Sequence, residues 1–331
     1  LVGDFLYYGT EAGTVEVFFL EDWVVLSTVE IRLNEAIKAI YPNATGAAIV
    51  VVDQANNIFL FSSVASGVDG VQSSLEFVDA PSNVVSALWD VKQSDVIIIF
   101  DGTFVHTYVY VPHSMKGALL TKLGPVTVSS EGQIELNPDK VETFGGDQPI
   151  LSTNGILTCQ TMTGDLSTMH HPFFDQLQDK KKRDRHEIEE DDPAAQQSKI
   201  CQALALLQLE QAWEAALKLD RRQFWLALSG KAMELLQMDL ACRVYRQLGD
   251  AGMVMALQEM GQYEDKDLLA GHVSLLFCDY MRAQELFLKS SRPKTALEMR
   301  KDLLQWDQAL QLAETLAASD TPEIYVKNGE Q

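Results

Sequence analysis

The chain has 331 residues, of which 47% are hydrophobic and 22% charged, as in an ordinary folded soluble protein with room for two domains. Its 47 acidic residues outnumber the 26 basic ones and give a formal net charge of −21. A field of that sign repels phosphate backbones, so we expect no nucleic-acid partner.

Cysteine spacing and hydropathy further narrow the class of protein to which the chain can belong. The four cysteines, Cys159, Cys201, Cys242 and Cys278, lie far apart and form no C-x-x-C pair. We therefore expect buried free thiols in a reducing compartment rather than disulfides or a zinc site. No apolar run approaches the ~20 residues needed to span a membrane. Because residue 1 is Leu, we expect a fragment of a longer protein, in which missing targeting signals say little.

Short apolar runs broken by turn residues predict strands from the start of the chain. A partial unit has strands at 5–9 and 15–19, separated by a turn at Gly13. A complete unit follows, with turns at Gly46 and at Asn56-Asn57. Its strands are expected at 37–41, 48–52 and 58–61. Strands bounded by such residues predict an antiparallel meander.

The three-strand order recurs twice more. The next copy has a turn at Asp101-Gly102 and strands expected at 84–89, 96–100 and 104–111. A weaker copy runs from 150 to 169 and turns at Asn154-Gly155. The turn glycines Gly46, Gly102 and Gly155 are 56 and 53 residues apart. This period is somewhat longer than the ~40–45 residues of a WD-repeat blade.

The repeat favours a WD40-type β-propeller over a sheet sandwich, which also gives short strands. Three to four blades are fewer than most propellers need, since these typically have ~4–8. An unclosed set would expose sheet edges. We therefore expect the remaining blades before Leu1, and residues 1–172 to be the C-terminal blades of a partial propeller.

Residues 173–197 are expected to be a charged linker. A basic run over 180–185 is followed by an acidic run over 187–192, and between 176 and 197 almost nothing is apolar except Ile188. Such a segment cannot bury a core, so a solvated linker or loop is favoured. A docking peptide or nuclear localisation signal is the alternative, although the acidic run would mask the basic one.

Residues 198–331 are expected to begin a tetratricopeptide-like α-solenoid. From Ala203 the apolar residues recur at helical spacing. One side is expected to be lined by Leu204, Leu207, Ala212, Trp213, Ala216 and Leu217, and the next helix by Trp225, Leu228, Ala232, Leu235 and Leu236. A break is expected at 237–239, and the helix that follows stops at Gly249-Asp250.

That layout returns later in the chain. The sequence at 239–250 resembles that at 279–293, with Ala241 and Ala283 in register. Trp306, Ala309, Leu310, Leu312 and Ala313 open a similar unit. The 42 residues between Ala241 and Ala283 exceed the ~34 of a regular tetratricopeptide repeat, which predicts degenerate units in an array that continues.

No constellation points to catalysis or metal binding. His170-His171 with Cys159 matches no ligand spacing, so these histidines are expected to be surface or turn residues. The remaining candidates are expected to be structural or core residues: His106, His272, Trp213, Trp225 and Trp306. There is no G-x-S-x-G, phosphate-binding loop or H-E-x-x-H. We expect no catalytic residues, no cofactor-binding residues, no metal ligands and no cofactor.

Several stretches resemble a known family. They are FFLEDW at 18–23, ILTCQTMTGDLS at 156–167, RVYRQLGDAGMVMALQE at 243–259, EDKDLLAGH at 264–272 and ALEMRKDLLQWDQALQLAETLA at 296–317. Together they look like the intraflagellar transport protein 144 family, the WD-repeat and tetratricopeptide subunits of intraflagellar transport complex A. The resemblance covers most of the chain. It implies the later blades of a second propeller followed by the first turns of a solenoid.

The resemblance also implies a role. It suggests a non-enzymatic scaffold that supports retrograde ciliary transport and the ciliary entry of membrane-protein cargo. Implied partners are the other complex A subunits, with complex B, dynein-2, ciliary cargo adaptors and peripheral membrane contact as further candidates. The implied location is the cilium or flagellum (axoneme, ciliary base and basal body) and the cytoplasm. Alternatives are a propeller–solenoid subunit of a vesicle coat or nuclear pore, or a peptidase with a propeller lid.

Overall fold

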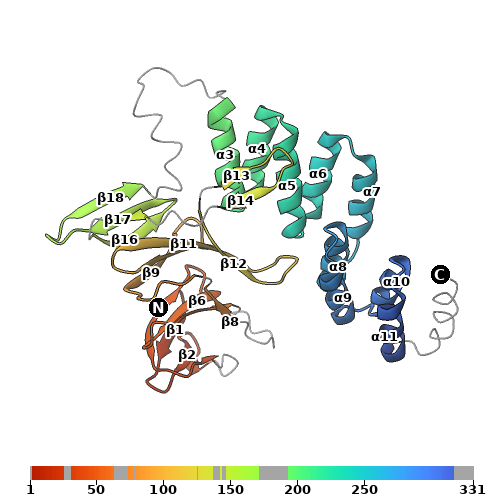
Figure 1. Ribbon diagram of the computed structural model, residues 1–331. Helices are drawn as coiled ribbons and strands as arrows, with labels where there is room; N and C mark the ends of the chain where they lie inside the picture. The colour runs from red at the N-terminus through yellow and green to blue at the C-terminus, as the bar shows by residue number, and fades with distance from the viewer. Residues whose placement is uncertain are drawn as a thin grey trace. The chain divides into compact units, whose positions relative to one another are not determined.

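The computed structural model describes residues 2–25, 31–62, 74–77, 79–124, 126–136, 142–143, 147–170 and 193–316 (Figure 1). It divides into two compact units. Unit 1 comprises Leu1–Pro112 and Ala118–Phe224, and unit 2 comprises His113–Gly117 and Trp225–Gln331. The expected linker up to residue 192 and the chain beyond residue 316 lie outside the described residues.

Unit 1 begins with two four-stranded antiparallel sheets. The first contains β1 (Phe5–Gly9), β2 (Thr14–Phe19), β3 (Val24–Val25) and β4 (Ile31–Arg32). The second contains β5 (Ile37–Pro42), β6 (Ala48–Asp53), β7 (Ile58–Ser62) and β8 (Ser74–Glu76). Strands that follow one another in sequence pair in an antiparallel manner, except that β4 pairs with β2 rather than with β3.

Two further sheets and a hairpin follow in unit 1. The five-stranded sheet contains β9 (Ser86–Trp89), β10 (Val96–Phe100), β11 (Phe104–Val111), β12 (Leu119–Lys122) and β15 (Glu142–Thr143). The hairpin pairs β13 (Val126–Val128) with β14 (Ile134–Leu136). The three-stranded sheet contains β16 (Gln148–Thr153), β17 (Ile156–Gln160) and β18 (Leu166–His170). The expected propeller-type meanders are therefore confirmed.

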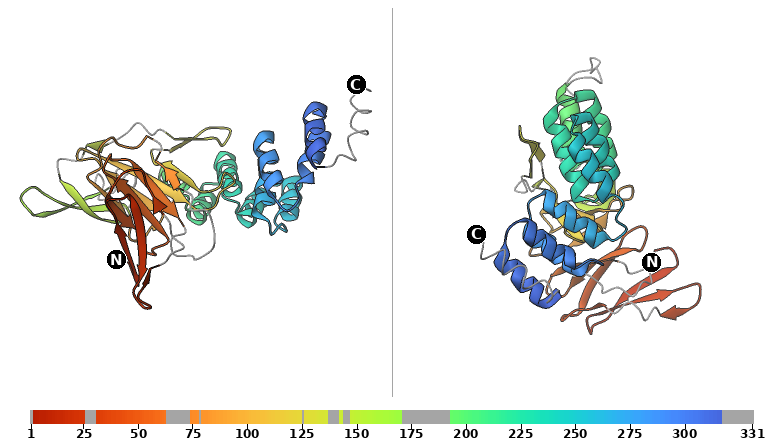
Figure 2. Two further views of the ribbon diagram at one scale, coloured as in Figure 1. Left: turned by 90° about the horizontal axis from the view of Figure 1, so that it is seen from below. Right: turned by 90° about the vertical axis from the view of Figure 1, so that its right-hand side faces the viewer.

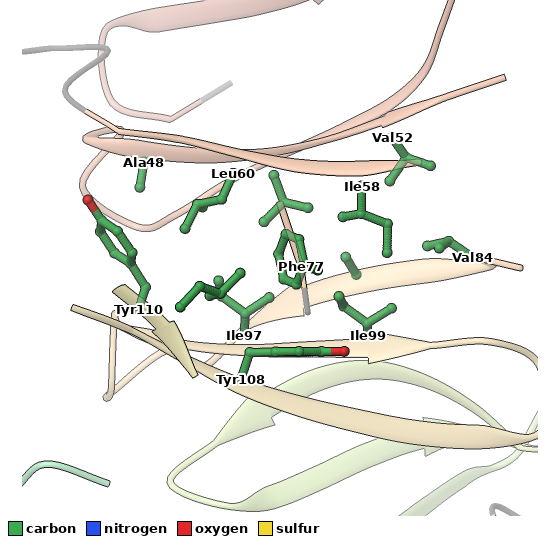
Figure 3. Packing of buried hydrophobic residues seen from close by; sticks show 13 residues of the cluster. Ala48, Val52, Ile58, Leu60, Phe77, Val84, Ile97, Ile99, Tyr108 and Tyr110 are labelled. Atoms are coloured by element: carbon green, nitrogen blue, oxygen red, sulfur yellow. The ribbon is translucent and has the colours of Figure 1, made fainter. Parts of the chain in front are cut away.

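The core of unit 1 lies between successive sheets. Along β6, Val50 and Val52 face the third sheet, whereas Ile49 and Val51 face the first. Because both faces of this strand are covered, all six of its residues are buried. Figure 3 shows the cluster between the second and third sheets, with Leu60 and Tyr108 on opposite sides. Stacked two-faced meanders are the packing of propeller blades.

The helices begin inside the segment expected to be a linker. α3 spans Pro193–Ala205 and α4 spans Leu209–Leu219, so residues 193–197 are helical rather than extended linker. Ala205 and Leu206, at the end of α3, pack into the core cluster that also holds Leu157 and Cys159 of β17. The end of α3 thus contributes directly to the core of unit 1.

The remaining helices are short and follow one another closely. They are α5 (Arg222–Glu234), α6 (Met238–Leu248), α7 (Ala251–Met260), α8 (Lys266–Leu276), α9 (Tyr280–Lys289), α10 (Lys294–Asp302) and α11 (Trp306–Leu316). Within unit 2, α6 packs on α7, α8 on α9, and α10 on both α9 and α11 (Figure 2). The propeller-then-helices order expected from the sequence is confirmed.

Two helix boundaries differ from the expected ones. The face predicted over Leu204 to Leu217 is divided between α3 and α4, because Leu207 adopts φ 58° and ends α3. The break expected at 237–239 falls earlier, since Met238 already begins α6. The stop at Gly249 is confirmed: it caps α6 in the left-handed conformation with φ 73°. The wide spacing from Ala241 to Ala283 contains the additional helix α7.

Candidate interaction surfaces

The dipeptide Trp89-Asp90 joins the third sheet to the sheets on both of its sides. Trp89 ends β9, and its indole Nε1 donates to the Tyr41 carbonyl oxygen in β5 at 2.8 Å. Asp90 is 1% exposed and forms an isolated parallel bridge with Ser152 in β16. The Val91 N–H also donates to the Ser152 carbonyl oxygen at 3.0 Å. Two adjacent residues therefore bond to strands that are far apart in the sequence.

The Asp90 carboxylate is the common acceptor of five hydrogen bonds at this junction. Asp90 accepts from the Ser152 hydroxyl at 2.7 Å and from the N–H groups of Lys92 at 2.9 Å, Gln93 at 3.0 Å, Asn154 at 3.0 Å and Gly155 at 3.3 Å. Burial alone would raise the pKa of Asp90, but the hydrogen bonds outweigh it and hold that pKa below its ordinary value. The ionised carboxylate is thus saturated with internal donors and is structural.

The expected Asp101-Gly102 turn is confirmed. Gly102 adopts φ 100°, and the Asp101 carboxylate accepts from the N–H groups of Thr103 at 2.7 Å and Phe104 at 2.6 Å. His106 is 9% exposed, and its Nε2 lies 3.1 Å from Asp101 Oδ2. Burial opposes ionisation of Asp101, but these contacts lower its pKa overall. The structural role expected for His106 is consistent with this contact.

The histidine–cysteine candidate does not form a site in the described part of the chain. His170 ends β18, whereas His171 lies outside the described residues. Cys159 is buried in β17, where burial and then the negative charge of Asp147 raise the pKa of its thiol to about 11. Among the described residues, no group of three or more His, Cys, Asp and Glu side chains could hold a metal ion.

The four cysteines are free, as expected, but they differ in exposure. Cys159 and Cys242 are buried and Cys201 is half-buried. Burial raises the pKa of the Cys201 and Cys242 thiols. The expectation of burial is wrong for Cys278, which is exposed because it occupies a turn between two helices.

The aromatic and histidine candidates of the helices mostly contribute to packing. Trp225 is 3% exposed, and Trp306 packs against the cluster formed by α8 to α11. His272 stacks on Tyr263 at a centroid distance of 4.9 Å and meets the Phe287 ring edge-on at 5.0 Å. Burial lowers the pKa of His272, which favours its neutral form. These contacts support the core roles expected from the sequence.

One turn geometry recurs at four helix ends. In each turn a non-glycine residue adopts the left-handed conformation: Leu207 (φ 58°), Leu236 (φ 57°), Cys278 (φ 59°) and Leu304 (φ 56°). The N–H of the following residue donates to the carbonyl five positions back, as Gln208 does to Ala203 at 2.8 Å. This is the Schellman arrangement. Five positions after each left-handed residue stands a fully buried alanine: Ala212, Ala241, Ala283 and Ala309.

The sequence carries this repeat, although only Ala241 and Ala283 were predicted to be in register. The triplet Leu-Leu-Gln occurs at 206–208, 235–237 and 303–305, each time followed by an apolar and then an acidic residue. The copy at 277–279 is Phe-Cys-Asp, and Met281 stands where the other copies have an acidic residue. The triplet itself is the signal that locates the turns.

This turn leaves apolar side chains at the surface of unit 2. Phe277 is 42% exposed, Met281 61% and Leu304 57%. In the first copy of the turn, by contrast, Leu206 is only 7% exposed, because it packs into the core of unit 1. Phe277 and Met281, four residues apart at the start of α9, and Leu304 before α11 are therefore the candidate positions for contact with another protein. No such signal for catalysis exists in the described residues.

Leu304 should destabilise unit 2, because it adopts the left-handed backbone conformation. We expect Leu304→Gly to raise the free energy of unfolding of unit 2 by about 0.5–1 kcal/mol, because left-handed backbone costs a β-carbon-bearing residue ~1–2 kcal/mol and glycine nothing comparable. Little burial is lost, since Leu304 is largely exposed. The converse variant, Gly249→Ala at φ 73°, should destabilise. Chemical denaturation of both variants measures the effect, and a stabilised Gly249→Ala would contradict it.

Arg300 is a buried cation held by neutral acceptors. It is 2% exposed in α10, and its Nε donates to Gln284 Oε1 in α9 at 2.7 Å. Its Nη1 donates to Gln305 Oε1, and its Nη2 donates to the Tyr280 carbonyl oxygen at 3.3 Å. Burial lowers the pKa of the guanidinium. Arg300 thus connects α9, α10 and the start of α11.

Asp265 makes the corresponding connection at the start of α8. Its Oδ1 accepts from the N–H groups of Asp267 at 2.9 Å and Leu268 at 3.3 Å, which caps the helix. Its Oδ2 accepts from the Ser291 N–H at 2.6 Å. Bonds from Ser291 first, and then those within α8, lower the pKa of Asp265 to about 2.

These bonds predict acid sensitivity. Because the folded pKa of Asp265 lies below its unfolded value of ~3.9, the bonds stabilise unit 2 fully above pH ~4. That contribution should be lost as the pH falls from about 4 through about 2. Asp265→Asn should therefore lower the Tm at pH 7. The difference in Tm between wild type and this variant should become smaller as the pH falls. An equal difference in Tm at pH 7 and at pH 2.5 would contradict the stabilising role of the Asp265 bonds.

Comparison with known proteins places these features in a family. The model described as WDR19 second beta-propeller matches residues 1–171. WD repeat-containing protein 19 of Homo sapiens is 32% identical over 329 residues, and that of Mus musculus is 30% identical over the same length. WD repeat-containing protein dyf-2 of Caenorhabditis elegans is 25% identical. Each alignment covers 98% of this chain and 22% of the relative, so the chain spans about a fifth of those proteins.

None of the helices that the structure describes is long and apolar enough to cross a bilayer.

Proposed function

Because the chain belongs to the family of the WDR19 second β-propeller, we propose that it is a scaffold segment of intraflagellar transport complex A. The proposed roles are retrograde ciliary transport and the ciliary entry of membrane-protein cargo. The observation that carries the proposal is the alignment with WD repeat-containing protein 19, which covers 98% of this chain and so includes both the sheets and the helices. That range supports the family expected from the sequence rather than a shared propeller fold alone.

The proposed mechanism is protein–protein contact without catalysis. The saturated carboxylates of Asp90 and Asp265 and the internally bonded His106 are consistent with structural roles. Rigid blades and helix pairs offer extended surfaces, and specific interfaces bury roughly 1,200–2,000 Å². The helices would contact neighbouring complex A subunits, and the blades would meet membrane cargo or its adaptors. Complex B and dynein-2 are further proposed partners.

The proposed location is the axoneme and base of the cilium, together with the cytoplasm. A test is depletion of the protein in ciliated cells, with rescue by a fluorescent copy and kymographs of transport along the axoneme. We expect slower retrograde movement, accumulation of transport material at the ciliary tip, and label at the ciliary base. Unchanged movement in both directions after depletion would refute the proposal. Label at the Golgi or nuclear envelope alone would instead favour the vesicle-coat or nuclear-pore alternative.

A further inference from the structure

Ser291 combines exposure with a structural bond. It lies in the turn between α9 and α10 and is exposed, whereas its neighbour Ser290 is 9% exposed. The Ser290 hydroxyl donates inward to the Phe287 carbonyl oxygen at 2.7 Å. The Ser291 backbone N–H instead donates to the Asp265 carboxylate at the start of α8. Of the two serines, only Ser291 is therefore accessible to an enzyme.

The surroundings of Ser291 are basic along the chain and acidic across the turn. Lys289, Arg292 and Lys294 flank the serine within a few residues. A positively charged segment suits the acidic substrate cleft of a kinase that selects basic sequences. On the other side, the Ser291 N–H is only 2.6 Å from Asp265 Oδ2. Any negative group added to Ser291 would therefore stand beside an ionised carboxylate.

We propose that Ser291 is a phosphorylation site at which a kinase selective for basic sequences loosens the junction between the α8–α9 and α10–α11 pairs. In this step the Ser291 Oγ attacks the γ-phosphorus of ATP and forms a new P–O bond. The bond from that phosphorus to the β–γ bridging oxygen breaks, ADP leaves with the electron pair, and the hydroxyl proton passes to the general base of the kinase. This site is independent of the transport role proposed above.

Phosphorylation of Ser291 would weaken its contact with Asp265, because it adds negative charge beside a carboxylate. A phosphoserine carries about −1.5 to −2 charges at pH 7 and no longer has a hydroxyl hydrogen to donate. Asp265 then faces a like charge on the residue whose N–H donates to it. The Ser291 N–H bond to Asp265 weakens, because the carboxylate is repelled from the turn. The turn loses the bond that ties it to the start of α8.

The first test uses the purified chain, MgATP and the catalytic subunit of cyclic-AMP-dependent protein kinase, with peptide mass spectrometry as the readout. We expect phosphate on Ser291, its loss in Ser291→Ala, and its retention in the matched control Ser290→Ala. Phosphate found only on other residues, or no incorporation, would overturn the proposal.

The second test measures the effect on the helices. Ser291→Asp should lower the Tm by about 3–6 °C and speed hydrogen exchange at the Asp267 and Leu268 amides, whereas Ser291→Ala should have a smaller effect. In an Asp265→Asn background the aspartate at position 291 should have little further effect, because the repelling partner is gone. An equal loss of Tm in both backgrounds would refute the like-charge mechanism.

Discussion

Asp90→Ala should lower the free energy of unfolding of unit 1 by about 3 kcal/mol or more. The substitution leaves the Ser152 hydroxyl and four backbone N–H groups without their common acceptor. Each buried donor left unsatisfied costs ~1–3 kcal/mol, and solvent entering the cavity offsets part of the sum. The loss also removes the side-chain bond between Asp90, directly after β9, and Ser152 of β16, and leaves only the backbone bond from Val91 to Ser152.

Urea denaturation of the purified chain measures this effect. Asp4→Ala is the control, because Asp4 is an exposed acid of the same unit. Trp89→Phe should cost about 1 kcal/mol, since it removes one hydrogen bond to Tyr41 and keeps most of the ring. An Asp90→Ala variant no less stable than Asp4→Ala would mean that the carboxylate does not hold the sheets together.

Gly271→Ala should lower the free energy of unfolding of unit 2 by about 1–3 kcal/mol. A β-carbon at Gly271 in α8 would lie 2.5 Å from a ring carbon of Phe287 in α9. Phe287 is fully buried, so its ring has little room to move. The usual helix preference for alanine over glycine, worth ~1 kcal/mol, therefore cannot offset the overlap.

The chain offers a matched control in another helix. A β-carbon at Gly230 in α5 would meet nothing within 4 Å, so Gly230→Ala should stabilise the protein by up to about 1 kcal/mol. The double variant Gly271→Ala/Phe287→Leu should recover part of the loss, because leucine frees the space that the new methyl group needs. Thermal unfolding compares the three variants. Equal stabilisation by both alanine substitutions would contradict the close packing of α8 and α9.

Much of the β region could be predicted because its strands are buried on both faces. Strands such as β6 and β10 are continuous apolar runs that end at turn residues, and their limits were predicted to within a residue or two. The short strands β3, β4, β8 and β12 to β15 were missed, because two to four residues give no usable periodicity.

The helix turns were harder to locate, for a conformational reason. Helices commonly end at a glycine, which marks the end in the sequence, and Gly249 was found in this way. Leu207, Leu236 and Leu304 end helices without that signal, since leucine is an unusual residue at positive φ. The contacts of Asp90 could not be predicted either. Its partners in β16 are more than sixty positions away, and spacing alone does not identify them.

Membership of the proposed scaffold is tested most directly by affinity purification of the tagged protein from ciliated cells, with quantitative mass spectrometry of the bound proteins. If the chain belongs to complex A, the other subunits of that complex should be recovered in near-stoichiometric amounts. Recovery of coatomer or nucleoporins without ciliary subunits would contradict this membership.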